Sequence, residues 1–121
     1  MTDQTNHTAS GNTPGLDAPL KAVGKVVGAA SITATSYLRA ECGFKPKYVC
    51  FENVTDRIKV EWYEGMADDS CIKTAANGTR TLEVTGGNGG ITVDGRGFRV
   101  LQNATLAVVT ADDTHCWRAH S

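Results

Sequence analysis

Three short stretches of the chain carry residue types that enzymes and ion-binding sites use. Asp68-Asp69 and Asp112-Asp113 are pairs of neighbouring carboxylates, and residues 86–90 (GGNGG) form a glycine-rich run. A calcium loop needs aspartates that alternate with other residues, and both pairs lack that spacing. A phosphate-binding loop needs a Lys-Ser/Thr step and a following helix, and the glycine-rich run has neither. These stretches are therefore predicted to be solvated loops and a hairpin tip.

The pair His115-Cys116 has the residue types of a nucleophile and its general base. Adjacent side chains in a strand point to opposite faces, so these two cannot form the hydrogen bond that activates a thiol. The three histidines, at positions 7, 115 and 120, all lie near a chain end. We therefore expect no catalytic residue, no cofactor and no enzymatic activity.

Four cysteines lie at positions 42, 50, 71 and 116, without a Cys-x-x-Cys pair or a histidine at zinc-finger spacing. This pattern argues against a metal site. The N-terminus lacks the basic start and apolar run of a secretory signal, so free thiols are expected rather than disulfides. For the same reason the four Asn-x-Ser/Thr sequences, at Asn6, Asn53, Asn77 and Asn103, are expected to form turns and not to carry glycans.

Charge and hydropathy argue against two classes of partner. The chain has 12 basic and 13 acidic residues and a formal net charge of −1. Binding to nucleic acid needs a basic face, so no nucleic-acid partner is expected, although the balance is compatible with a local basic patch. The sequence contains no run of 18 apolar residues, so no membrane span is expected.

A length of 121 residues with 40% hydrophobic residues predicts one domain with a modest core.

The elements that would position these residues are short strands. Residues 48–53 and 58–63 alternate between apolar and polar side chains around a polar turn, which predicts a β-hairpin. Trp62 is expected on the core face of the second strand. Tyr63 is expected on the opposite face, where an exposed tyrosine can contact a partner.

Turn signals divide the rest of the chain every 8–12 residues. Further strands are predicted over residues 23–27, 31–39, 79–84, 91–93, 97–101, 104–110 and 115–120. Residues 64–77 are predicted to be a loop. Many short strands at this spacing indicate an all-β sandwich or barrel. Its core is expected to include Trp62, Phe98 and Trp117.

The first twenty residues have a different character. Residues 1–14 are almost entirely polar and cannot bury enough surface to offset the entropy of ordering them. We expect residues 1–20 to form an extended, flexible arm ahead of a β-sandwich domain over residues 21–121. The first apolar stretch of the arm is predicted to dock on a partner, together with Tyr63. This stretch comprises Leu16, Asp17, Ala18, Pro19 and Leu20.

Four short sequences carry a resemblance to a known group of proteins. They are GFKPKYV at residues 43–49, NVTD at 53–56 with Glu61-Trp62, GRGF at 95–98, and Trp117-Arg118-Ala119. Their order resembles small β-sandwich structural proteins of tailed-phage virions, above all capsid cement or decoration proteins. Related domains also occur in tail fibres. The resemblance covers about residues 40–121.

The resemblance implies a jelly-roll-like antiparallel β-sandwich or barrel that cements or decorates a phage capsid by bridging subunits of the major capsid protein. It further implies a homo-oligomer, expected to be a trimer, on the capsid surface of a virion assembled in the host cytoplasm. The alternative is a tail-fibre or host-recognition domain that binds glycan through Tyr63 and the loop of residues 85–90. Four cysteines are many for a cement protein.

Overall fold

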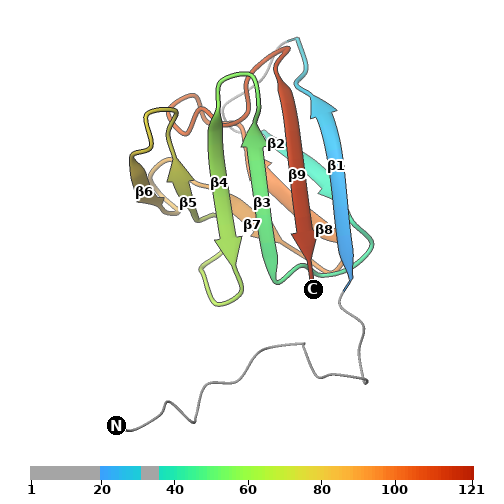
Figure 1. Ribbon diagram of the computed structural model, residues 1–121. Helices are drawn as coiled ribbons and strands as arrows, with labels where there is room; N and C mark the ends of the chain where they lie inside the picture. The colour runs from blue at the N-terminus through green and yellow to red at the C-terminus, as the bar shows by residue number, and fades with distance from the viewer. Residues whose placement is uncertain (1–19, 31–35) are drawn as a thin grey trace, which may run out of the picture.

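The computed structural model describes residues 20–30 and 36–121, which form two antiparallel β-sheets packed face to face (Figure 1). The strands of this described part are β1 (Lys21–Val27), β2 (Tyr37–Glu41), β3 (Tyr48–Asn53), β4 (Ile58–Tyr63), β5 (Cys71–Thr74), β6 (Arg80–Glu83), β7 (Ile91–Val93), β8 (Gly97–Leu101) and β9 (Thr114–His120). The larger sheet has the order β1-β9-β3-β4-β5-β6, and the smaller has the order β2-β8-β7. The all-β sandwich predicted from the sequence is therefore confirmed.

The alternative of a barrel is wrong for the described residues. The larger sheet ends at β1 on one side and at β6 on the other, and the smaller sheet ends at β2 and β7. Closure would need a continuous ladder between the sheets, whereas the link between them is the isolated bridge from Ser70 to Ile91. The molecule is a sandwich with open edges.

The hairpin of β3 and β4 forms as the alternation predicts. Phe51 lies opposite Val60, and both are fully buried. The turn closes through a hydrogen bond from the Arg57 N–H to the Asn53 carbonyl, 2.7 Å long. Arg57 has a φ of 62°, a left-handed conformation that is unusual for a residue with a side chain. The Asn53 side chain supports this turn by accepting a bond from the Asp56 N–H.

The core lies between the two sheets and contains aromatic rings from both. Phe51 of the larger sheet and Phe98 of the smaller sheet meet edge to face, with centroids 6.4 Å apart. The ring of Trp117 also packs against Phe98, at 5.2 Å. Trp62 is buried, as predicted, with 4% of its surface exposed. The remaining buried apolar residues are Leu38, Ala40, Val49, Val60, Cys71, Ile91, Val100, Leu106, Val108, Val109 and Ala119.

Trp117 extends from β9 over the neighbouring edge strand. A Cβ atom on Gly24 of β1 would lie only 2.5 Å from the indole ring, closer than any real contact. Gly24 therefore provides the space that the ring occupies, and Trp117 packs over the glycine. The indole therefore covers the inner side of β1, a strand that has no fully buried side chain of its own.

Two predictions about secondary structure are corrected. Residues 104–110 are not a strand but part of an irregular segment, in which Ala107 has a φ of 62°. Leu106, Val108 and Val109 are nevertheless buried, because this segment folds across the core. The predicted loop of residues 64–77 contains β5, which pairs with β4 and β6. Of the predicted strand 31–39, residues 31–35 lie outside the described part, and β2 begins at Tyr37.

The smaller sheet carries an ion pair on its outer surface. The guanidinium of Arg39 in β2 donates to both carboxylate oxygens of Asp94, in the turn between β7 and β8. Asp94 also accepts bonds from the N–H groups of Arg96 and Gly97. The Arg39 hydrogen bond, followed by the bond from the Arg96 N–H, lowers the pKa of Asp94 below its usual range.

We predict that Leu106→Ala lowers the free energy of unfolding by about 2–5 kcal/mol, as for a leucine in a strand of the core, because its side chain is fully buried. The matched control is Thr105→Ala at the exposed neighbouring position, which should change stability by less than about 0.5 kcal/mol. Urea unfolding of both variants measures the difference. Equal, small effects would mean that the segment does not pack on the core.

Asp94→Asn should lower the melting temperature by a few degrees at pH 7, because the ionised carboxylate is stabilised only in the folded state. That stabilisation is fully present above the ordinary aspartate pKa of about 3.9 and is lost as the pH falls toward the lowered folded-state pKa. Melting curves of the two proteins should therefore converge below about pH 4. A gap that stays constant from pH 7 to about pH 2 would contradict this assignment.

Candidate functional site

The acidic pairs singled out in the sequence serve the fold. Asp69 has a φ of 58°, and its carboxylate accepts a bond from the Gly90 N–H. Its own N–H donates to the Ile91 carbonyl, at 3.0 Å. Asp69 therefore fastens the loop before β5 to β7, so it is more than the solvated loop residue that was predicted. Asp113 likewise accepts a bond from the side chain of Asn53.

His115 and Cys116 lie on opposite faces of β9, as their adjacency predicts. His115 is fully buried and stacks on Phe51, whereas Cys116 is exposed. The Nε2 atom of His115 accepts a bond from the Thr110 N–H, and Nδ1 lies 3.3 Å from the Val26 carbonyl. A carbonyl only accepts, so Nδ1 carries the proton. The imidazole thus joins β1, β9 and the segment before β9.

The predicted turn role is confirmed for three of the four Asn-x-Ser/Thr sequences. The Oδ1 atom of Asn77 accepts from the Thr79 N–H, and that of Asn103 accepts from the Thr105 N–H. Asn53 is completely buried and bonds to Asp56 and Asp113, so its amide has no room for a glycan. Asn6 lies outside the described residues.

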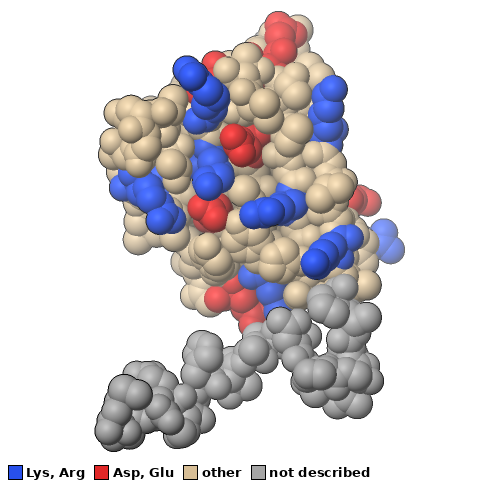
Figure 2. Space-filling model, in the orientation of Figure 1, with Lys and Arg blue, Asp and Glu red and all other residues tan. Residues whose placement is uncertain are grey.

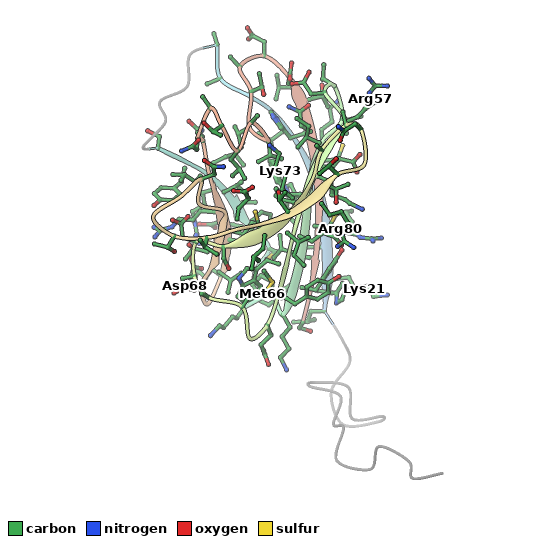
Figure 3. All side chains as sticks on the ribbon, turned by 90° about the vertical axis from the view of Figure 1, so that its left-hand side faces the viewer. Lys21, Arg57, Met66, Asp68, Lys73 and Arg80 are labelled. Carbon is green, nitrogen blue, oxygen red and sulfur yellow. The ribbon has the colours of Figure 1, made fainter. Side chains whose placement is uncertain are left out.

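The broadest face of the described part is the outer face of the larger sheet. We define the outer face as the side chains of β1, β9, β3, β4, β5 and β6 that point away from the smaller sheet. The strand register aligns them in rows, of which one runs Val23, Arg118, Cys50, Glu61, Ile72 and Leu82. Figure 3 shows Lys21 and Arg80 on this side of the molecule, and Asp68 on the side of the smaller sheet. The outer face therefore extends across the whole width of the sheet.

The outer face is basic although the chain as a whole is weakly acidic. Its acidic residues are Glu52 and Glu61, and its basic residues are Lys21, Lys25, Lys59, Arg80 and Arg118. The formal charge of this face is therefore +3, compared with −1 for the chain. Figure 2 shows the acidic groups near the middle of the face with basic groups around them.

Glu61 neutralises part of this charge. Its carboxylate lies 3.8 Å from the Lys59 ammonium and 3.9 Å from the Arg80 guanidinium. Among the described residues, Lys21, Lys25 and Arg118 have no carboxylate within ion-pair distance. These three basic side chains lie toward the β1 side of the sheet, so the positive potential is concentrated there.

An aromatic row crosses the outer face at the end where β1 begins. Tyr48 stacks on His120 with centroids 4.9 Å apart and meets Tyr63 at 5.1 Å. The Tyr48 hydroxyl donates to Glu61 at 2.8 Å. Burial, followed by the bond to Glu61, raises the pKa of Tyr48. Tyr48 is thus fixed in place, while Tyr63 keeps 44% of its surface exposed.

A shallow depression of about 690 Å³ lies beside this row, between β1 and β4. Val23 and Lys25 line it on the β1 side, and Lys59 lines it on the β4 side. The thiols of Cys50 and Cys116 lie between them on neighbouring strands. Cys116 is exposed and Cys50 is half-buried, so Cys116 is the accessible thiol of the pair. Burial also raises the pKa of the Cys50 thiol.

The predicted partner-binding residues are placed only in part. Leu16, Asp17, Ala18 and Pro19 lie outside the described residues, as does the rest of the arm over residues 1–19. Leu20 is 52% exposed, and its backbone bonds to Ser121 extend the ladder of β1 and β9. Tyr63 lies on the outer face, opposite to Trp62, as predicted. Leu20 and Tyr63 are at the same end of the sheet.

The basic residues of the outer face were not singled out from the sequence. Each occupies an outward position of an alternating strand, which is the signal that the sequence contains. Lys21 and Arg118 are nearly a hundred positions apart, however, and come together only because β1 pairs with β9. The strand order is therefore needed to recognise the face.

Comparison with known proteins gives no match to a protein-family model, to a curated protein or to a solved structure. Within residues 20–30 and 36–121, no group of three or more His, Cys, Asp or Glu side chains is arranged to hold a metal ion. The same residues contain no helix of the length and hydrophobicity needed to cross a membrane.

The four cysteines are free and should differ widely in reactivity. Cys116 is exposed, whereas Cys71 is fully buried, and burial raises its pKa to about 12. We predict that Ellman's reagent at pH 8 labels one thiol rapidly and reaches Cys71 only after denaturation. Cys116→Ser should remove the rapid phase. A rapid phase that persists in this variant would contradict the placement of β9.

Proposed function

We propose that this chain is a structural protein of a tailed-phage virion that cements or decorates the capsid by bridging subunits of the major capsid protein. The observation that carries the proposal is the broad outer face, with a charge of +3 on a chain of net −1. Such a face complements an acidic protein surface and steers association with it. The resemblance over residues 40–121 supplies the identity of that partner.

The position at which the chain enters the sandwich supports a contribution from the arm. Leu20 is held beside Ser121 by two hydrogen bonds. Leu20 therefore lies at the end of the outer face where β1 starts (Figure 1), the same end as the aromatic row of Tyr48, Tyr63 and His120. An arm that docks on one capsid subunit while the outer face contacts another would bind through two linked sites.

The proposal includes a jelly-roll-like topology and a homo-oligomer, with the trimer that the resemblance implies. Within the described residues the chain crosses between the sheets from β1 to β2, from β2 to β3, from β6 to β7 and from β8 to β9, and β1 lies beside β9. Double-sheet jelly rolls with this kind of exchange recur in viral capsid and lectin domains. The proposed location is the capsid surface, after assembly in the host cytoplasm.

A second candidate function rests on the aromatic row. Tyr63 is exposed beside the fixed ring of Tyr48, an arrangement on which a sugar ring can stack. This favours a tail-fibre or host-recognition domain that binds glycan. The loop of residues 85–90, which is expected to contribute, bonds to Asp68 and Asp69 through Thr85 and Gly90. Loss of glycan-array binding in Tyr63→Ala would support this candidate over the first.

We predict that deletion of residues 1–19 leaves a folded protein that binds capsid shells at least about tenfold more weakly, because one of two linked contacts is lost. Leu20 is kept so that its bonds to Ser121 remain. Co-sedimentation with shells of the major capsid protein from the same genome measures binding, and the melting temperature controls for folding. If the shortened protein decorates shells as fully as the intact one, the arm has no bridging role.

The double variant Lys59→Glu/Arg118→Glu tests the outer face separately. It should reduce shell binding by at least about tenfold and weaken the salt dependence of the remaining binding. Arg96→Glu/Arg99→Glu is the matched control, because both arginines are exposed on the smaller sheet or its turn and the change in charge is the same. Equal effects of the two charge reversals would exclude the outer face as the contact surface.

A further inference from the structure

The edge strand β1 presents unused backbone hydrogen-bonding groups. Hydrogen bonds from the Ser121 N–H to the Leu20 carbonyl and from the Gly28 N–H to the Asp113 carbonyl bracket the strand. Hydrogen-bonded pairs alternate with non-bonded pairs in an antiparallel ladder. The N–H and C=O groups of the even-numbered residues of β1 therefore point toward β9. The N–H and C=O groups of Lys21, Val23, Lys25 and Val27 point the other way. No described residue bonds to these groups.

The side chains of these four residues are also exposed. Val23 and Val27 have 79% and 57% of their surfaces exposed, and they alternate with Lys21 and Lys25. In Figure 1, β1 lies at the outer margin of the larger sheet, with no labelled strand beyond it. An open edge with β-branched residues is a template for another strand, and its lysines restrict which strand can pair.

We infer that β1 pairs antiparallel with β1 of a second copy of this chain, around a two-fold axis that passes between the two Gly24 residues. This register is the one that pairs all seven residues of β1. It places Lys21 opposite Val27 of the second copy and Val23 opposite Lys25 of the second copy. The free N–H and C=O groups of β1 thereby all gain hydrogen-bond partners in the second copy.

The neighbouring registers are disfavoured by charge. The backbone groups of the odd-numbered residues point to the open edge, so odd-numbered residues must pair with odd-numbered residues of the second copy. The two-fold axis can therefore pass only between two copies of the same residue. An axis at Val23 places Lys21 opposite Lys25, and an axis at Lys25 places the two Lys25 side chains opposite each other. Like charges that face each other directly across a ladder are destabilising. The register centred on Gly24 instead places an aliphatic side chain opposite each lysine.

Gly24 and Trp117 fit the proposed axis. Gly24 has no side chain, and the indole of Trp117 covers its inner side. Pairing would bring the half-buried Trp117 of each copy close to the axis, where its exposed part loses contact with water. The larger sheets of the two copies would then form one continuous sheet with two adjoining basic outer faces. This dimer differs from the trimer expected from the resemblance, and it does not depend on the proposed capsid role.

Sedimentation equilibrium tests the inference by measuring the mass of the assembly that the full chain forms. The unchanged chain is compared with two variants that place opposite charges at position 23. We expect a dimer of twice the 12.8 kDa chain mass. Val23→Lys places lysines opposite Lys25 at two symmetric positions, and Val23→Glu places opposite charges there. The dissociation constant of the Lys variant should exceed that of the Glu variant by at least about tenfold. Both keep every backbone group of the β1–β9 ladder. Because Val23 also lies opposite Arg118 of β9, melting curves of the dissociated chains measure the separate effect of each charge within one chain.

Several results would overturn the inference. A monomer at all concentrations would exclude the pairing, and slow amide exchange at Val23 and Lys25 in that monomer would show that residues 1–19 or 31–35 cover the edge. Equal weakening by Val23→Lys and Val23→Glu would exclude the register centred on Gly24. A trimer or larger ring would exclude the two-fold pairing of β1 with β1.

A blue shift of tryptophan emission on dimerisation supports the inference, because Trp62 is already buried and Trp117 alone changes its surroundings.

Discussion

The contact between Phe51 and Phe98 joins the two sheets and sets the position of the other large core residues. Phe51 also stacks on the buried His115, while Phe98 receives the edge of Trp117. Four rings from β3, β8 and β9 therefore form one connected group. Aromatic pairs of this kind contribute about 0.5–1.5 kcal/mol each beyond the area that they bury, so the group is a large share of the stability of a small domain.

The inward position of these rings determines which side chains lie on the outer face of the larger sheet. Side chains alternate along a strand, so fixing Phe51 and Trp117 inside fixes Glu52 and Arg118 outside. The basic outer face is thus a direct consequence of core packing. A slip of one residue in β9 would turn Arg118 into the core and expose Trp117. The strand register that buries the core residues therefore also determines which charged side chains lie on the outer face.

The strands over residues 48–53, 58–63, 91–93 and 97–101 could be predicted because local alternation and turn residues determine them. Residues 104–110 misled the same argument, because alternation reports burial and does not distinguish a strand from an irregular segment that covers the core. The strand β5 was missed because its apolar signal is limited to Cys71 and Ile72 and its pairing depends on β4. The outer face could not be predicted, since it joins residues from the first and last strands, whose pairing is not encoded locally.

The position of β9 has a consequence for how the protein is made on the ribosome. β9 is synthesised after the other eight described strands, yet it lies between β1 and β3 in the sheet. Until Thr114–His120 emerges, β1 has no neighbour and the hairpin of β3 and β4 has an open side. The nascent chain thus exposes two open strand edges until β9 is synthesised, and the docking of β9 both completes this part of the sheet and covers those edges. A chain that terminates before β9 would lack the strand that joins β1 to β3, and would be a substrate for chaperones and proteases.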